Sequence, residues 1–127
     1  IERRAATLKN VIDVGPVSPD AVHEYYLDAI ALVNTSSFEG FPNTFLEAWR
    51  YDTPVLALAV DPNRFVTPTI RGYADGDFKE LVSLADRLGT DIGFRRELGH
   101  IAGEYVRSEL SIDKITEQYR KVIAEEL

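Results

Sequence analysis

The sequence predicts an α/β domain with a doubly wound, Rossmann-like parallel sheet, and three observations support this prediction. Two continuous apolar runs, Ile30–Val33 and Val55–Val60, are typical of strands buried on both faces of a sheet. Each run ends in polar residues, and an amphipathic helical pattern separates the two. Such alternation with short links implies right-handed crossovers and helices on both faces of the sheet.

The first third of the chain predicts a strand, a helix and a second strand. Val11–Val14 is a short apolar run that ends in a turn at Gly15-Pro16, which predicts a strand. Ser18-Pro19-Asp20 supplies cap candidates and a proline suited to a first helical turn, so we expect a helix to about Ala29. The apolar strand that follows ends in the polar segment Asn34–Ser37.

A turn and a second helix follow that polar segment. Gly40-Phe41-Pro42 predicts the turn, and the helix is expected to begin near Asn43 or Thr44 and to break at Asp52-Thr53-Pro54. The residues expected to face inward are Phe45, Leu46, Ala48 and Trp49. The next strand ends in a polar loop, Asp61–Arg64.

The last third of the chain predicts one more short strand and three further helices. Gly72-Tyr73-Ala74 is the candidate strand, and Asp75-Gly76-Asp77 is a turn and cap that starts a helix at Phe78. The other two helices are expected from Ile92 to Leu110 and from Ser111 to the end, and we interpret them as scaffold. The helix from Ile92 to Leu110 contains several glycines. Each of them weakens this helix by up to about 1 kcal/mol relative to alanine, so we expect a break or close packing there. These glycines are Gly93, Gly99 and Gly103.

The length and composition indicate one globular domain spanning residues 1–127. A chain of 127 residues is small for a complete two-domain enzyme. It contains no methionine, even at position 1, so we expect either a processed product or an excised piece of a longer protein, and we favour the excised piece. No apolar run approaches the roughly 18 residues of a membrane span, and no signal-peptide pattern opens the chain.

The charge and the absence of cysteine exclude several classes of function. The net charge of -7 is spread along the chain without a basic block, which argues against nucleic acid as the main partner. Zero cysteines exclude a disulfide framework, thiolate chemistry and cysteine-ligated metals. The absence of cysteine fits a reducing setting, and we therefore expect a cytoplasmic protein.

The segment from Ser36 to Glu47 carries the chemistry of this sequence. It places two carboxylates, Glu39 and Glu47, with seven residues between them, around a turn that leads into a helix. In a doubly wound sheet, ligands lie outside the carboxyl ends of the strands. The first turn of a helix also has unpaired amides that bind anions. We therefore expect both carboxylates and these amides to converge on one anion-binding corner.

Structural alternatives remain open for the same residues. Thr44 and Glu47 match a capping box, in which each side chain bonds the other residue's backbone amide. Glu39 is equally compatible with a solvated loop acid. Elsewhere, the paired tyrosines Tyr25-Tyr26 are expected to supply half-buried packing, and the sequence gives no role for Asp13 inside its strand.

These residues also carry a family resemblance. Ser36–Glu47, continued by Ala48-Trp49 and Thr53-Pro54-Val55, resembles the C-terminal, nucleotide-sugar-binding domain of the retaining GT-B glycosyltransferases of family 4, the glycosyl transferases group 1. The family pattern has a serine, an acid-glycine-phenylalanine-proline turn and a second glutamate eight residues after the first. Asn10–Val17 and Gly76–Gly99 resemble flanking parts of the same domain, so the resemblance covers most of the chain.

The resemblance implies a role for each matched residue. Glu39 would be catalytic, facing the donor sugar and its anomeric region, and Glu47 would accept hydrogen bonds from the ribose hydroxyls. Ser36 is a further substrate-binding candidate. The turn and helix start would place backbone amides against the sugar and diphosphate, and these residues are Gly40, Phe41, Pro42, Asn43 and Thr44. The implied reaction retains the anomeric configuration and needs no cofactor and no divalent metal.

The sequence departs from the family pattern at two places. Asp52 stands where the family usually has glycine. Asp61-Pro62-Asn63-Arg64 replaces a common Gly-Gly loop, where Arg64 is either a bidentate phosphate ligand or a solvated loop arginine. The basic Arg/Lys pair of such enzymes is expected upstream of residue 1.

Three functions follow from these patterns. The first, which the resemblance implies, is transfer of a sugar from a nucleoside-diphosphate donor to an acceptor glycan or lipid. This chain would bind the donor and be inactive alone, because the N-terminal domain of the GT-B arrangement is expected to be missing. Peripheral attachment to the inner face of the membrane through that missing half is an open alternative to a purely cytoplasmic protein. The second is a noncatalytic nucleotide-binding or assembly domain of the same fold, which both departures favour. The third is a glycoside hydrolase with two carboxylates, which the placement of both acids at one corner disfavours. The sequence names neither the sugar, the nucleotide nor the acceptor.

Overall fold

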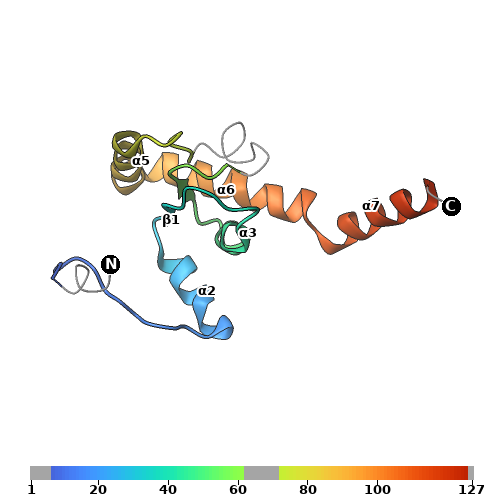
Figure 1. Cartoon of the computed structure of the whole chain (residues 1–127), viewed down its shortest axis with the longest axis horizontal. Coiled ribbons are helices and arrows are strands. Elements are labelled where there is room, and N and C mark those ends of the chain that lie inside the picture. Colours follow the sequence, from blue (N-terminus) through green and yellow to red (C-terminus); the bar gives the residue numbers. More distant parts are fainter. Residues whose placement is uncertain (1–6, 62–71, 126–127) are drawn as a thin grey trace.

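The computed structural model describes residues 7–61 and 72–125 and shows a mixed helix and strand fold (Figure 1). A small parallel sheet stands at its centre, and two of the helices lie at the C-terminal end of the chain. The elements are α2 (Pro19–Asp28), β1 (Leu32–Asn34), α3 (Asn43–Arg50), β2 (Val55–Ala57), α5 (Phe78–Thr90), α6 (Ile92–Glu109) and α7 (Ile112–Glu125).

The two strands pair in parallel, as the alternation of strands and helices predicts. Leu32 lies opposite Val55, and the ladder ends where Asn34 lies opposite Ala57. The predicted strand at Gly72–Ala74 is reduced to one parallel bridge between Ala57 and Tyr73. The described part of the sheet therefore has two strands and one bridge.

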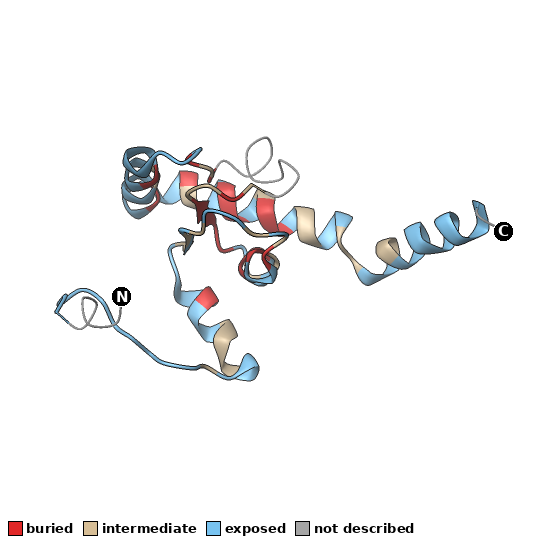
Figure 2. Cartoon of the chain, in the orientation of Figure 1, coloured by how far each residue is buried: buried red, intermediate tan, exposed pale blue. Residues whose placement is uncertain are grey.

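The hydrophobic core lies where α3, β2, α5 and α6 meet (Figure 2). Its largest fully buried side chains are Trp49, Phe45, Leu56, Leu88, Leu98 and Val55. Three of the four residues predicted to face inward from α3 are buried, and Leu46 is half-buried. The apolar spacing of this short helix thus identifies its core face.

Short polar side chains start the C-terminal helices at the predicted places. The carboxylate of Asp77 accepts a hydrogen bond from the Lys79 amide at the start of α5. Asp91 accepts one from the Phe94 amide at the start of α6, at 2.8 Å. These caps satisfy amides that a helix leaves unpaired at its first turn, so the predicted helix starts are confirmed.

The prediction of a strand at Val11–Val14 is wrong. This segment is extended, but it pairs with no other strand in the described part of the chain. Ile12 is 85% exposed, so the apolar run has no sheet to be buried against. Asp13 has a local role instead, because its carboxylate accepts a hydrogen bond from the Gly15 amide and closes the turn.

The prediction that both inner strands are buried on both faces holds only for β2. All three residues of β2 are buried, although the strand ends at Ala57 rather than at Val60. β1 begins at Leu32 rather than at Ile30, and its central residue Val33 is 51% exposed. Leu32 and Asn34 point to the other face and are half-buried, so in the described part of the chain the face of β1 that carries Val33 stays open.

The glycines of α6 allow close packing rather than a break. The helix runs uninterrupted from Ile92 to Glu109. A Cβ at Gly99 would stand 1.9 Å from the backbone oxygen of Asp52, and a Cβ at Gly103 would stand 1.7 Å from an Asp52 carboxylate oxygen. Gly99 therefore has to be glycine so that the turn after α3 can lie against α6, whereas at Gly103 a larger residue would displace the ends of the Asp52 and Arg107 side chains.

The last helix projects away from the core (Figures 1 and 2). Among the described residues of α7 none is buried, and Ile112 and Tyr119 are more than two-thirds exposed. The expectation that the C-terminal helices are scaffold therefore fits α6, which packs on α3 and α5, better than α7.

Candidate functional site

The loop after β1 holds Glu39 in a defined position. The Asn34 amide group donates a hydrogen bond to Glu39 Oε1 at 2.8 Å. Asn34 Oδ1 in turn accepts a hydrogen bond from the Ser36 amide at 3.0 Å. One asparagine at the end of the strand therefore fixes both the loop backbone and the predicted catalytic carboxylate.

The same contacts keep Glu39 negatively charged. Hydrogen bonds from the Ser36 and Asn34 side chains hold the pKa of the Glu39 carboxyl below its usual value. A carboxylate with a lowered pKa stays ionised at neutral pH, so it acts as a fixed negative charge rather than as a proton donor. The structure thus brings Ser36 and Glu39 together, as the motif predicts.

Glu39 lines a small hollow formed by the loops after both strands. The volume of this hollow is about 180 Å³, and Phe38, Ala59 and Asp61 also line it. Because both loops follow parallel strands, the hollow lies at the carboxyl edge of the sheet, where this architecture places ligands. Arg64, the candidate phosphate ligand of the second loop, lies outside the described residues.

The start of α3 offers free backbone amides next to this loop. Asn43 and Thr44 are exposed, and their amides have no hydrogen-bond partner in the part of the chain that the structure describes. Pro42 occupies the position before the helix and is buried. Phe41 anchors the turn, because its ring packs edge-on against Trp49 at 6.4 Å. A Cβ at Gly40 would meet nothing within 4 Å, so space remains beside the turn.

The capping box proposed as an alternative is not formed. No described side chain caps the first turn of α3, so Thr44 does not have the role that the box requires. Glu47 instead bonds to another helix, since its Oε2 accepts a hydrogen bond from the Tyr26 hydroxyl at 2.9 Å. The Glu47 carboxylate thus bonds to a residue of α2 and not to the backbone of its own helix.

Glu47 lines a second and larger hollow between α2 and α3. The volume of this hollow is about 400 Å³, and its walls include His23, Tyr26, Arg50 and Tyr51. Among the described residues, the two predicted glutamates therefore line separate hollows, so the structure does not bring both carboxylates to one corner as expected. A ligand that contacts both glutamates has to extend from one hollow to the other.

Two residues of this region were not predicted as functional. Asn34 ends its strand as a polar residue, and that position is the signal that points to it. Tyr26 was expected to supply packing alone, whereas its hydroxyl also holds Glu47. Nothing in the local sequence indicates this bond, because its two partners are 21 residues apart.

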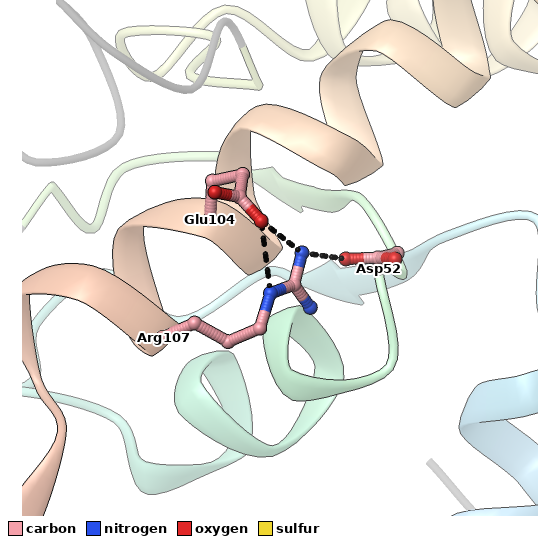
Figure 3. Close-up of polar contacts among 3 residues, drawn as sticks. All are labelled: Asp52, Glu104 and Arg107. Atoms are coloured by element: carbon pink, nitrogen blue, oxygen red, sulfur yellow. Dashed lines mark hydrogen bonds and ion pairs between the residues drawn. The ribbon is translucent and has the colours of Figure 1, made fainter.

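Asp52 is accommodated by α6 and by an ion pair (Figure 3). Its φ of 55° lies in the left-handed region that glycine favours. The Arg107 guanidinium lies 3.0 Å from the Asp52 carboxylate and 3.0 Å from that of Glu104. Gly103 leaves the space that the Asp52 side chain occupies. The departure from the family pattern is thus compensated on α6, away from both hollows.

The comparison with known families assigns this chain to a family. Residues 1–91 match the model of the family glycosyl transferases group 1, and the chain therefore belongs to that family. No solved structure matches the chain significantly. Its family is thus one of transferases that act on sugars.

Neither a group of metal ligands nor a membrane-spanning helix occurs among the described residues. Within residues 7–61 and 72–125, no three His, Asp or Glu side chains are grouped so that they would hold a metal ion. Of the helices that the structure describes, none combines the length and the apolar character needed to cross a membrane.

Proposed function

We propose that this chain is the donor-binding domain of a retaining glycosyltransferase of the GT-B type, with a doubly wound sheet. It binds a nucleoside-diphosphate sugar, and the sugar passes to an acceptor glycan or lipid that an N-terminal domain holds. The observation that carries the proposal is an ionised, hydrogen-bonded Glu39 in the loop that leads into the free amides at the start of α3. Membership of the glycosyl transferases group 1 gives this arrangement its substrate class.

The amides at the start of α3 bind the diphosphate in this proposal. The Asn43 and Thr44 amides are exposed and unpartnered among the described residues, and a helix N-terminus attracts negative charge. As the bond from the anomeric carbon to the diphosphate breaks, its electron pair moves onto the leaving oxygen. Preorganised donors stabilise this charge more than they stabilise the bound donor, which lowers the barrier.

Glu39 stabilises the sugar in the same transition state. The anomeric carbon gains positive charge as the diphosphate leaves, and an ionised carboxylate nearby favours that charge. The oxygen of the acceptor hydroxyl then forms the new bond on the same face, and its proton passes to the leaving diphosphate. Because Asn34 and Ser36 hold Glu39 before the donor binds, the protein does not have to reorganise during the reaction.

Glu47 binds the nucleoside half of the donor across the first turn of α3. It is an exposed carboxylate on the wall of the 400 Å³ hollow, and it accepts hydrogen bonds from the ribose hydroxyls. The aromatic rings of Tyr26 and Tyr51 in the same wall give that hollow an apolar side. The donor thus extends from one hollow to the other, with its diphosphate at the helix start.

Calorimetric titration of UDP- and GDP-sugars into the chain tests this proposal. We expect weak binding that weakens further with salt, because the amides attract an anion at an exposed site. Glu47→Ala should weaken it by roughly tenfold, the usual cost of losing a hydrogen bond to a charged group. Glu24→Ala is the matched control, since Glu24 is an exposed acid of α2 that lines a different hollow. An absence of binding up to millimolar nucleotide sugar would count against the proposal.

The second candidate is a noncatalytic nucleotide-binding or assembly domain. The observation that favours it is Asp52, the departure from the family glycine, whose carboxylate makes an ion pair with Arg107 of α6. The complete polypeptide separates the two candidates. Nucleotide binding without sugar transfer would identify the noncatalytic domain.

A further inference from the structure

A buried tyrosine of α2 holds the Glu47 carboxylate from one side. The Tyr26 hydroxyl donates a hydrogen bond to Glu47 Oε2 at 2.9 Å, and Tyr26 is 8% exposed. The second carboxylate oxygen, Oε1, accepts no hydrogen bond from any residue that the structure describes. Because a carboxylate has two oxygens that each accept hydrogen bonds, one oxygen of Glu47 remains available to a ligand.

Tyr26 is itself fixed by packing and by hydrogen bonding. Its ring stacks on Tyr51, with centroids 6.3 Å apart and planes 12° apart. Its backbone carbonyl accepts a hydrogen bond from the Thr53 hydroxyl at 2.7 Å. Thr53 is buried, and its amide bonds to the carbonyl of Ala48 in α3. The hydroxyl that meets Glu47 is therefore tied to both helices that wall the hollow.

The Tyr26 hydroxyl remains a donor at all ordinary pH values. Its burial, together with the hydrogen bond to Glu47 and the charge of Glu47, raises the pKa of Tyr26 to about 12. The phenol is thus protonated throughout the neutral range, and Glu47 always faces a donor rather than a second negative charge.

We propose that Tyr26 is a positioning residue, which fixes the Glu47 carboxylate so that its free oxygen selects nucleoside diphosphates with ribose hydroxyls. This inference rests on the proposed function, in which Glu47 binds the ribose. A glutamate on an exposed helix face has several rotamers, and a ligand that bound it would have to order it. Tyr26 orders the carboxylate before the ligand arrives. If this hydrogen bond only held α2 against α3, its loss would weaken the binding of all nucleotides to the same extent.

The test compares ribose with dideoxyribose in the same protein. The dissociation constants of UDP and GDP are measured by calorimetry, together with those of their 2′,3′-dideoxy forms. In the unsubstituted chain we expect the dideoxy forms to bind about tenfold more weakly. Tyr26→Phe keeps the ring and removes the donor, and should reduce this ratio to about twofold. Tyr25→Phe is the control, because Tyr25 is 50% exposed and lines a different hollow.

The outcomes separate this inference from the proposed function. A ratio lowered by Glu47→Gln but unchanged by Tyr26→Phe would overturn the positioning role alone, even if Tyr26→Phe weakened the binding of every nucleotide. No binding of UDP or GDP by the unsubstituted chain would overturn the proposed function and this inference together.

A second variant tests the inference if Tyr26→Phe does not fold. Glu47→Asp changes an exposed side chain and keeps the charge, but its shorter side chain does not reach the Tyr26 hydroxyl. We expect Glu47→Asp to lose the preference for ribose as Glu47→Gln does. If Glu47→Asp kept the tenfold ratio, charge alone would select ribose, and the positioning role would be wrong.

Discussion

Replacing Gly99 with alanine should destabilise the turn that follows the helix carrying Glu47. The new Cβ would stand 1.9 Å from the backbone oxygen of Asp52. An ordinary contact between carbon and oxygen is about 3.3 Å, so the two atoms must separate by about 1.4 Å. The turn has little freedom to do so, because the Asp52 amide bonds to the Trp49 carbonyl and the Thr53 amide bonds to that of Ala48.

The size of the effect follows from two opposing contributions. Forcing extra atoms into a packed site costs about 1–3 kcal/mol. The cost of Gly99→Ala should lie at the upper end of this range, because the atom that the new Cβ meets belongs to the backbone. Alanine gains up to about 1 kcal/mol over glycine inside a helix. The free energy of unfolding should therefore fall by about 2 kcal/mol, which lowers the melting temperature of a domain of this size by roughly 8 °C.

Thermal and urea unfolding followed by circular dichroism measure this loss. Gly89→Ala in α5 is the matched control, because its Cβ would meet nothing within 4 Å, and it should be neutral or stabilising. Gly103→Ala should be intermediate, since its nearest neighbours are the ends of the Asp52 and Arg107 side chains, which can swing away. If Gly99→Ala proved as stable as Gly89→Ala, the packing of this turn against α6 would be wrong.

Two further predictions concern titration. Asn34→Ala removes one of the two donors to Glu39, so the pKa of the Glu39 carboxyl should rise toward its usual value in a carbon-13 NMR titration. An unchanged pKa would contradict the role given to Asn34. Tyr26 has a pKa of about 12 in the folded chain against 10.0 as the reference for the unfolded one. Its contribution to stability is therefore complete below pH 10 and is lost as the pH rises through this interval. The free energy of unfolding should thus fall more steeply with alkaline pH in the unsubstituted chain than in Tyr26→Phe, and equal slopes would contradict this assignment.

The helices were predictable because their signals are local. Asp77 and Asp91 cap the amides two and three residues ahead, and this bond forms whatever the rest of the chain does. The core face of α3 follows from apolar spacing in the same way, because the short helix has one side on which Trp49 and Phe45 both lie.

The strands were less predictable because a strand depends on its neighbour. Val11–Val14 has the composition of a strand, but that composition does not show which partner would receive its hydrogen bonds. Val33 shows a different error. It does lie in a strand, as predicted, but the apolar pattern of that strand implies burial on both faces. The described chain covers only one of these faces, so the residue is 51% exposed.

The position of Glu39 was predictable, but its partner Asn34 was not. Asn34 lies five residues before Glu39 and outside the Ser36–Glu47 motif, and its place at the polar end of the strand is the signal that points to it. The bond between Tyr26 and Glu47 depends instead on how α2 packs against α3. For that reason the local pattern offered only a capping box as a structural alternative for Glu47, whereas in the folded chain Glu47 bonds to a residue of another helix.

Sugar transfer by the complete polypeptide tests the central claim most directly, with Glu39→Gln as the variant. The account predicts that the variant binds the donor but transfers sugar at least about a hundredfold more slowly, because the negative charge beside the anomeric carbon is lost. Glu97→Gln, a change of an exposed acid on α6, should leave the rate unaltered. Undiminished transfer by Glu39→Gln would contradict the account.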